Sequence, residues 1–319
     1  MRVAVTGAGG RLGSALVKTL GGSPFVEEVL AWDLPDHDLD DPNSAQRLVG
    51  TYRPDALVHC AAWTDVDGCA LDPDLAMRRN GIAVDEIARA CVSAVAGLII
   101  ISTNEVFDGS RTNGVPYSPT ERPHPANPYG ASKLAGETAA RTAFGATGYD
   151  FNKAAFTEDD REQVPPLAIV RTAWLFGGPG TDFPRKILAA ARRSVAKHRS
   201  LALVSDEIGT PTYASDLASA IVRMLGEAAR PGGRGFGGIH HVVNGGQASR
   251  AAWAREVLRL AGVGVTTEDV PLSTWPRRST PPVWGVLETT PLPGGLLRDW
   301  RDALAEEMVR MTSKVEERP

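Results

Sequence analysis

The fold of this chain is decided by its first stretch, Arg2-Val3-Ala4-Val5-Thr6-Gly7-Ala8-Gly9-Gly10-Arg11-Leu12-Gly13. Arg2–Thr6 predicts a short buried strand, and the spacing of Leu16 and Leu20 predicts a helix after the glycines. Glycines permit a tight turn and a close backbone approach, while a helix amino terminus offers free N–H groups to a pyrophosphate. The order of strand, glycine turn and helix therefore favours a dinucleotide site over a plain turn. Its predicted cofactor-binding residues are Gly7, Gly10, Arg11, Leu12 and Gly13.

A carboxylate follows at the spacing that such a site requires. Glu28–Trp32 predicts a second strand, and Asp33 ends it twenty positions after Gly13. A carboxylate in this place binds the ribose hydroxyls of a dinucleotide. Asp33 would repel the 2′-phosphate of NADPH, whereas Arg11 would attract it. We therefore expect either NADPH or NADH to serve as the cofactor, with weak discrimination.

Strands and helices alternate through the rest of the first half. Helices are predicted over Pro42–Gly50 and Leu71–Val95, and strands over Ala56–Cys60, Gly97–Ser102 and Leu167–Arg171. This alternation predicts an α/β fold, a doubly wound parallel sheet of the Rossmann type. We expect residues 1–172 to form the NAD(P)-binding domain. Residues 173–319 should form mainly a smaller C-terminal substrate-binding lobe, with some later segments returning to the sheet.

The second half has weaker signals. We predict helices over Thr181–Lys197, Ser215–Glu227 and Ser249–Ala261, strands over Leu201–Val204 and Ile239–Asn244, and a frayed end from Lys314. The tail to Met311 is rich in Pro, Trp and Arg, and its Arg277 and Arg278 are candidates for binding a nucleotide pyrophosphate. The polar segment Gly145–Pro166 is either a surface excursion or a flap over a ligand.

The most informative side chains lie in Asn127-Pro128-Tyr129-Gly130-Ala131-Ser132-Lys133. Tyr129 and Lys133 stand four apart at the start of a predicted helix, so they share one face. An ammonium about 4 Å from a phenol, at an effective dielectric of about 20, would lower the phenol pKa by up to about three units. Tyr129 is therefore a candidate proton donor, activated by Lys133.

Further polar candidates follow predicted strands, because ligands of doubly wound sheets lie beyond the carboxyl ends of the strands. Ala61 and Ala62 follow the third strand, and Thr103, Asn104 and Glu105 follow the fourth. Normal winding places Thr103 opposite Tyr129. Strand alternation would put Glu105 on the same side as Thr103.

Composition restricts the partners. The net charge of the 319 residues is -4, without a long basic or acidic run, which argues against nucleic acid or an anionic membrane as the main partner. No apolar stretch is long enough to span a bilayer, and the amino terminus has no signal-like apolar core. The three cysteines lack metal-ligand spacing and fit buried thiols in a reducing compartment. We expect a cytoplasmic protein with a small-molecule ligand.

Together these motifs resemble the extended short-chain dehydrogenase/reductases. Within that superfamily, longer stretches are similar to the dTDP-4-dehydrorhamnose reductase family: Arg53–Asp67, Ile101–Gly109, Tyr129–Glu137, Val170–Gly177 and Gly209–Thr212. The resemblance implies that Thr103, Tyr129 and Lys133 are catalytic, that Asp38 and Leu39 lie beside the adenine, and that Trp174 lines the sugar-nucleotide pocket. The superfamily motifs alone would fit reductases, epimerases and dehydratases equally.

Two positions depart from the family pattern. Asn104-Glu105 stands where the family usually has Asp-Tyr, so we expect Glu105 to help select the sugar, with an amino sugar gaining most. A solvent-facing Glu105 is the alternative. Ala15 stands where some members have a glutamate that helps a metal-linked dimer, and we therefore predict no such metal.

The sequence thus predicts an NADPH- or NADH-dependent reductase that acts on the C4 keto group of a dTDP-4-keto-6-deoxy sugar, in deoxysugar or rhamnose biosynthesis. A sugar-nucleotide epimerase or dehydratase and a non-catalytic NAD(P)-binding regulatory subunit are the alternatives. The sequence leaves open the exact sugar, the stereochemistry at C4, the pathway, and whether the protein is a monomer or a homodimer.

Overall fold

A six-stranded parallel sheet with strand order β10-β5-β4-β3-β1-β2 forms the centre of the computed structural model, which describes residues 1–146, 165–230 and 236–316. The strands are β1 (Arg2–Thr6), β2 (Glu28–Trp32), β3 (Ala56–His59), β4 (Gly97–Thr103), β5 (Leu167–Thr172) and β10 (Gly238–His241). All five neighbouring pairs are parallel. The predicted doubly wound sheet is confirmed. The last strand ends at His241, three residues earlier than predicted.

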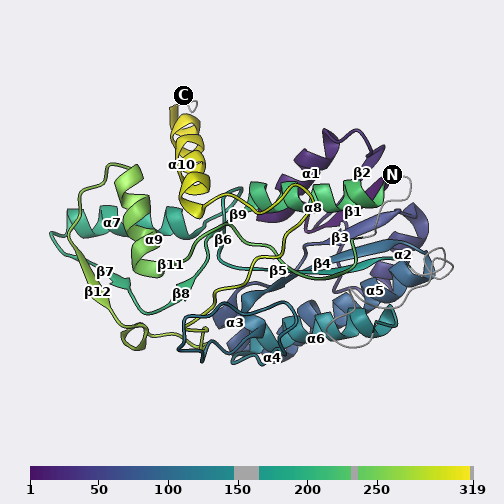
Figure 1. Ribbon diagram of the computed structural model, residues 1–319, viewed down its shortest axis with the longest axis horizontal. Coiled ribbons are helices and arrows are strands. Elements are labelled where there is room, and N and C mark those ends of the chain that lie inside the picture. Colours follow the sequence, from purple (N-terminus) through teal and green to yellow (C-terminus); the bar gives the residue numbers. More distant parts are fainter. Residues whose placement is uncertain (147–164, 231–235, 317–319) are drawn as a thin grey trace.

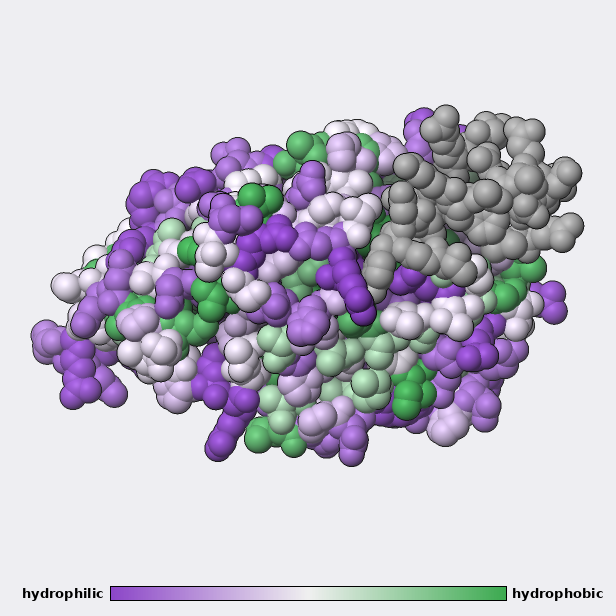
Figure 2. Space-filling view, turned by 60° about the horizontal axis from the view of Figure 1, so that its bottom comes forward, coloured by the Kyte–Doolittle hydropathy of each residue, from purple (hydrophilic) through white to green (hydrophobic). Residues whose placement is uncertain are grey.

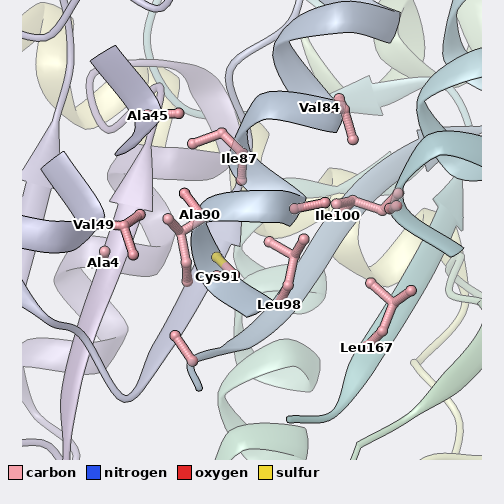
Figure 3. Packing of buried hydrophobic residues seen from close by; sticks show 14 of the residues in the cluster. Ala4, Ala45, Val49, Val84, Ile87, Ala90, Cys91, Leu98, Ile100 and Leu167 are labelled. Atoms are coloured by element: carbon pink, nitrogen blue, oxygen red, sulfur yellow. The ribbon is translucent and has the colours of Figure 1, made fainter. Parts of the chain in front are cut away.

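Helices cover both faces of this sheet (Figure 1). One face carries α1 (Arg11–Gly21) and α8 (Ala214–Ala228); the other carries α2 (Ser44–Tyr52), α5 (Ala83–Ser93) and α6 (Pro128–Ala143). Figure 3 shows the packing on the second face, where Ile87, Ala90 and Cys91 of α5 pack against Leu98 and Ile100 of β4. These side chains are at most 3% exposed, so α5 and α6 are held firmly against the strands that carry the site.

The prediction of one continuous helix over Leu71–Val95 is wrong, because the structure has several shorter helical segments there. The structure has α3 (Val66–Leu71), α4 (Pro73–Met77), a π-helical turn η1 (Arg78–Ile82) and then α5. Asp72 separates the first two, because its side chain accepts a hydrogen bond from the Leu75 backbone N–H at 3.0 Å and Pro73 occupies the first helical position. The π turn brings the buried Asn80 amide to the Trp63 backbone and to the Ser132 hydroxyl.

A second body of short elements lies beside the sheet (Figure 1). It comprises β6 (Leu175–Phe176), α7 (Phe183–Ala196), β7 (Leu201–Val204), β8 (Ile208–Gly209), β9 (Thr212–Tyr213), β11 (Ala248–Ser249), α9 (Arg250–Leu260), β12 (Thr267–Val270), η5 (Leu272–Thr274) and α10 (Trp300–Glu316). Helix α10 was not predicted; Trp300 and Leu304 bury its first turns against α9 and β9. It continues to Glu316, past the predicted onset of fraying at Lys314.

Within the residues that the structure describes, no helix is both long and apolar enough to cross a membrane. Hydrophilic and hydrophobic residues are intermixed over the face shown in Figure 2. The three cysteines are free, and Cys69 and Cys91 are buried. Most of the segment 145–166, for which a surface excursion or a flap was predicted, lies outside the described residues.

Candidate functional site

A cavity of about 340 Å³ opens beyond the carboxyl ends of β1, β2 and β3. Seven of the predicted cofactor-binding residues line it: Gly7, Gly10, Asp33, Asp38, Leu39, Ala61 and Ala62. Leu12 and Gly13 lie in the first turn of α1 and are buried. The strand-end placement expected from parallel winding therefore brings together residues from three separate stretches of the sequence.

The glycine turn fits a dinucleotide because the backbone packs more closely than side chains would allow. A Cβ on Gly13 would lie 2.0 Å from the carbonyl oxygen of Gly7, and Gly7 itself has a φ of +62°. The turn thereby brings the first N–H groups of α1 to the edge of the cavity. The residues present fit NAD(P)H, with Gly7, Gly10 and Gly13 shaping the pyrophosphate end.

Asp33 lies where its carboxylate can meet a ribose. One of its oxygens accepts a hydrogen bond from the Gly9 N–H, and the other accepts one from the Leu34 N–H at 2.9 Å. Two further carboxylates, Asp38 and Asp40, line the same cavity. Arg79 also lines it, but its guanidinium is paired with Asp40 at 2.7 Å.

Arg11 does not line the cavity. Its guanidinium donates a hydrogen bond to the Gly177 carbonyl at 2.8 Å and lies 3.5 Å from the buried carboxylate of Asp182. Asp182 in turn caps α7 by accepting a hydrogen bond from the Arg185 N–H. This arrangement gives no support to the predicted attraction of a cofactor phosphate by Arg11; the side chain joins the glycine turn to the second body.

The predicted catalytic residues come from the end of β4 and the first turns of α6. None of them lines the cavity itself, but Lys133 acts on His59 and Cys60, which do. Asn127 begins α6, since its Oδ1 accepts a hydrogen bond from the Gly130 N–H at 2.8 Å and Pro128 follows it. A Cβ on Gly130 would lie 2.0 Å from the Glu105 carbonyl oxygen, so this glycine lets α6 press against the end of β4. Thr103, Tyr129 and Lys133 are all buried, and the side chains of Thr103 and Tyr129 are hydrogen-bonded.

The electrostatics of Tyr129 differ from the prediction. Burial raises the pKa of Tyr129 well above its usual value, the Glu105 carboxylate raises it further, and the hydrogen bond from Thr103 opposes both. Burial also lowers the pKa of Lys133 to about 8, against the opposing effects of Glu137 and Cys60. The expectation that Lys133 lowers the pKa of Tyr129 is therefore wrong for this arrangement, because desolvation dominates.

Glu105 does not continue the strand. Residues Asn104–Val106 form a 3-10 turn, η2, so the alternation used to place Glu105 does not apply. Its Oε2 instead accepts a hydrogen bond from Asn127 Nδ2 at 2.7 Å. Asn104 is buried with its amide against Gly285. Glu105 is half-buried and hydrogen-bonded, which favours a role at the site over the solvent-facing alternative, and burial raises the pKa of its carboxyl group.

Two of the predicted substrate residues, Trp174 and Arg277, lie on the second body, whereas Thr103, Asn104 and Glu105 lie at the end of β4. The Arg250 guanidinium lies 3.6 Å from the centroid of the Trp174 ring, which also stacks on Trp253. Arg277 lies 3.5 Å from the Asp67 carboxylate, which also accepts hydrogen bonds from the backbone N–H groups of Arg278 and Ser279.

Some site residues were missed from the sequence. Arg250 is one, although its position after Ser249 at the start of a predicted helix was a usable signal. His59 is another: it lines the cavity and lies fully buried, and burial lowers its pKa to about 3. Its Nδ1 is hydrogen-bonded with the Thr6 hydroxyl, while its Nε2 has no hydrogen-bond partner among the described residues.

A parallel Rossmann sheet that carries a glycine turn and a buried Thr, Tyr and Lys beside one cavity defines a dinucleotide-dependent oxidoreductase of the short-chain dehydrogenase/reductase class. The family model described as RmlD substrate binding domain matches residues 1–313, and the chain belongs to this family.

Named relatives agree with this assignment. The chain is 35% identical over 317 residues to dTDP-4-dehydrorhamnose reductase of Mycobacterium tuberculosis (strain ATCC 25618 / H37Rv), covering 95% of this chain and 91% of the relative. It is similar to the crystal structure of a dTDP-4-dehydrorhamnose reductase from Clostridium acetobutylicum ATCC 824, with a TM-score of 0.82, 29% identity, and coverage of 98% and 100% of the two chains. The enzyme of that name from Bacillus anthracis str. Ames, solved in complex with NADP, matches with a TM-score of 0.80, 29% identity, and coverage of 97% and 99%.

Proposed function

We propose that this chain is an NAD(P)H-dependent reductase of the C4 keto group of a dTDP-4-keto-6-deoxy sugar, in deoxysugar biosynthesis. The observation that supports the proposal most is a buried Tyr129 hydrogen-bonded to Thr103, with the buried Lys133 acting on His59 and Cys60, which line a cavity that fits a dinucleotide. The relatives named above supply the class of substrate. The cytoplasmic location and the choice between monomer and homodimer stay predictions from the sequence.

Each residue of the candidate catalytic set has a separate role in the reduction. Bound NAD(P)H supplies the hydride that adds to the C4 carbon. Tyr129 donates its phenolic proton to the carbonyl oxygen as negative charge develops there, and its raised pKa keeps it in the protonated, donating form at neutral pH. Thr103 hydrogen-bonds the same oxygen, and Lys133 binds the nicotinamide ribose with its ammonium group. The product is the C4 alcohol.

The remaining residues would bind and orient. Asp33 would accept the adenosine ribose hydroxyls, and Asp38 and Leu39 would flank the adenine. Residues 173–319, apart from α8 and β10, would form mainly the substrate-binding lobe. There, Trp174 would line the sugar-nucleotide pocket, and Arg277 would bind the diphosphate together with Arg250.

The test is a turnover assay with NADPH or NADH and a panel of dTDP-linked 4-keto-6-deoxy sugars. We expect one equivalent of NAD(P)H to be consumed for each sugar reduced, with the C4 alcohol as the product. A product formed without net consumption of NAD(P)H would instead indicate an epimerase or dehydratase, because these regenerate their cofactor in each turnover. No product from any sugar in the panel would leave the regulatory subunit as the better interpretation.

A further inference from the structure

Five charged side chains surround the end of β4, and we call them the Glu105 cluster: Asp67, Glu105, Glu207, Arg250 and Arg277. Each guanidinium has a carboxylate of its own. Arg250 Nη2 lies 2.8 Å from Glu207, and Arg277 Nε lies 3.5 Å from Asp67. Glu105 is the third carboxylate, and it takes part in no ion pair within the residues that the structure describes. Both arginines and Glu207 nevertheless act on its titration, and Asp67 joins the cluster through Arg277.

The hydrogen bonds of Glu105 leave one of its oxygens available. Oε2 accepts a hydrogen bond from the neutral amide of Asn127 at 2.7 Å, and the backbone N–H of Glu105 donates to the Thr103 hydroxyl at 3.2 Å. No hydrogen bond to Oε1 is found among residues 1–146, 165–230 and 236–316. The carboxylate is therefore held in place by Asn127 and forms a direct ion pair with neither arginine.

This carboxylate also lies close to the reacting group. Its charge acts on the Tyr129 phenol, and Asn127, which binds it, begins the helix that carries Tyr129. A carbonyl that accepts a proton from Tyr129 therefore places the substituents on its neighbouring carbons near Glu105. A partly buried carboxylate without a counter-ion is costly, and a ligand that brings a positive charge removes that cost.

We infer that Glu105 binds an ammonium group next to the reacting carbonyl, so that the preferred substrate is a dTDP-linked 4-keto-6-deoxy sugar that carries an amino group. This inference rests on the proposed function. The charge balance supports it: a diphosphate would add negative charge to a cluster in which three carboxylates already outnumber two guanidiniums. An ammonium on the sugar offsets that excess, whereas a hydroxyl in its place does not.

The experiment compares two dTDP-linked 4-keto-6-deoxy sugars that differ only at C3, where one has an amino group and the other a hydroxyl. We expect wild type to prefer the amino sugar by at least about tenfold in kcat/KM. Glu105→Gln keeps an acceptor for Asn127 and removes the charge. It should lower kcat/KM about ten- to a hundredfold on the amino sugar and less than about threefold on the hydroxyl sugar, because only the former loses a charge-assisted hydrogen bond.

Two controls accompany the assay. Glu256→Gln removes the same charge from the Glu256–Arg259 pair on α9, in which Glu256 is 18% and Arg259 67% exposed, and it should leave the ratio between the two sugars unchanged. Equilibrium binding of the two corresponding C4 alcohols to the wild-type protein gives a readout without turnover. The amino alcohol should bind at least about tenfold more tightly, and this preference should disappear in Glu105→Gln.

The outcomes separate the inference from the proposed function. Reduction of both sugars with equal efficiency, or equal effects of Glu105→Gln on both, would overturn the role of Glu105 and leave the reductase activity established. If NAD(P)H is consumed with neither of the two sugars, this result would count against the proposed function itself. In that case, equal binding of the two alcohols would overturn the inference independently, and tighter binding of the amino alcohol would support it.

Discussion

Replacing Glu137 by Gln should destabilise the protein by about 3 to 5 kcal/mol, because it leaves Arg171 as a buried charge without its anion. Arg171 Nε and Nη2 donate hydrogen bonds to the two oxygens of Glu137 at 2.9 and 2.7 Å. The two side chains are 0% and 1% exposed, and Ser102 donates a further hydrogen bond to Glu137 at 2.5 Å. Glutamine has nearly the same shape, so the loss would come from charge rather than from a cavity.

Urea denaturation near neutral pH would measure this loss. The double variant Glu137→Leu/Arg171→Met should recover most of the stability, because apolar residues of similar volume often replace a buried ion pair at little cost. The matched surface control is again Glu256→Gln, whose partner Arg259 is 67% exposed. It should change the free energy of unfolding by less than about 1 kcal/mol.

The reasoning would be refuted by a loss below about 1 kcal/mol for Glu137→Gln, or by a double variant that is no more stable than Glu137→Gln alone.

The Glu137–Arg171 pair also affects activity. Ser102 precedes Thr103, and Glu137 lies one helical turn after Lys133, whose pKa it raises against the larger effect of burial. In the Glu137→Gln protein that remains folded, Lys133 should therefore lose its proton at a lower pH than in wild type.

Three further predictions follow from the site. Tyr129→Phe should lower turnover at least about a hundredfold with nearly unchanged NAD(P)H affinity, and more than about a tenth of wild-type turnover would exclude Tyr129 as the acid. Both cofactors should work within about tenfold, and Asp33→Ala should shift the preference towards NADPH; an unchanged kcat/KM ratio would mean that Asp33 does not face the ribose. Burial lowers the pKa of His59 and His241 from 6.5 to about 3 in the folded state, so the unfolded chain binds protons first on acidification. Unfolding free energy should fall below pH 6.5 by up to about 1.4 kcal/mol per pH unit for each histidine, and a flat urea-denaturation profile between pH 7 and 5 would contradict this.

The sheet and the relative placement of the candidate site residues could be predicted because their signals are local. Glycines at fixed spacing before a helix restrict what the backbone can do, and a Tyr and a Lys four residues apart on one helix share a face in any fold. Strand ends could be placed together without knowing the packing, because parallel strands end at one edge. As expected, Thr103 lies beside Tyr129 and Ala61 lines the cavity.

Other features depend on contacts that no local pattern contains. The π turn at η1 is tied to Asn80, whose partners Trp63 and Ser132 lie 17 and 52 residues away. Helix α10 has a weak apolar pattern of its own and is buried by α9 and β9. Arg11 had a plausible local role in the glycine turn, but its actual partners, Gly177 and Asp182, are supplied by the second body.

The titration of Tyr129 shows why the sign of an electrostatic effect requires the whole fold. A pairwise estimate from the spacing of Tyr129 and Lys133 includes one favourable charge and no desolvation. In the structure, burial and Glu105 both act in the opposite direction, and Lys133 is itself desolvated. A raised pKa keeps the proton on Tyr129 until the carbonyl arrives, but it also makes the phenol a weaker acid. Since Glu105 contributes to that rise, an ammonium bound to Glu105 would offset its charge and make the proton easier to transfer. Substrate recognition and proton donation would then share one carboxylate.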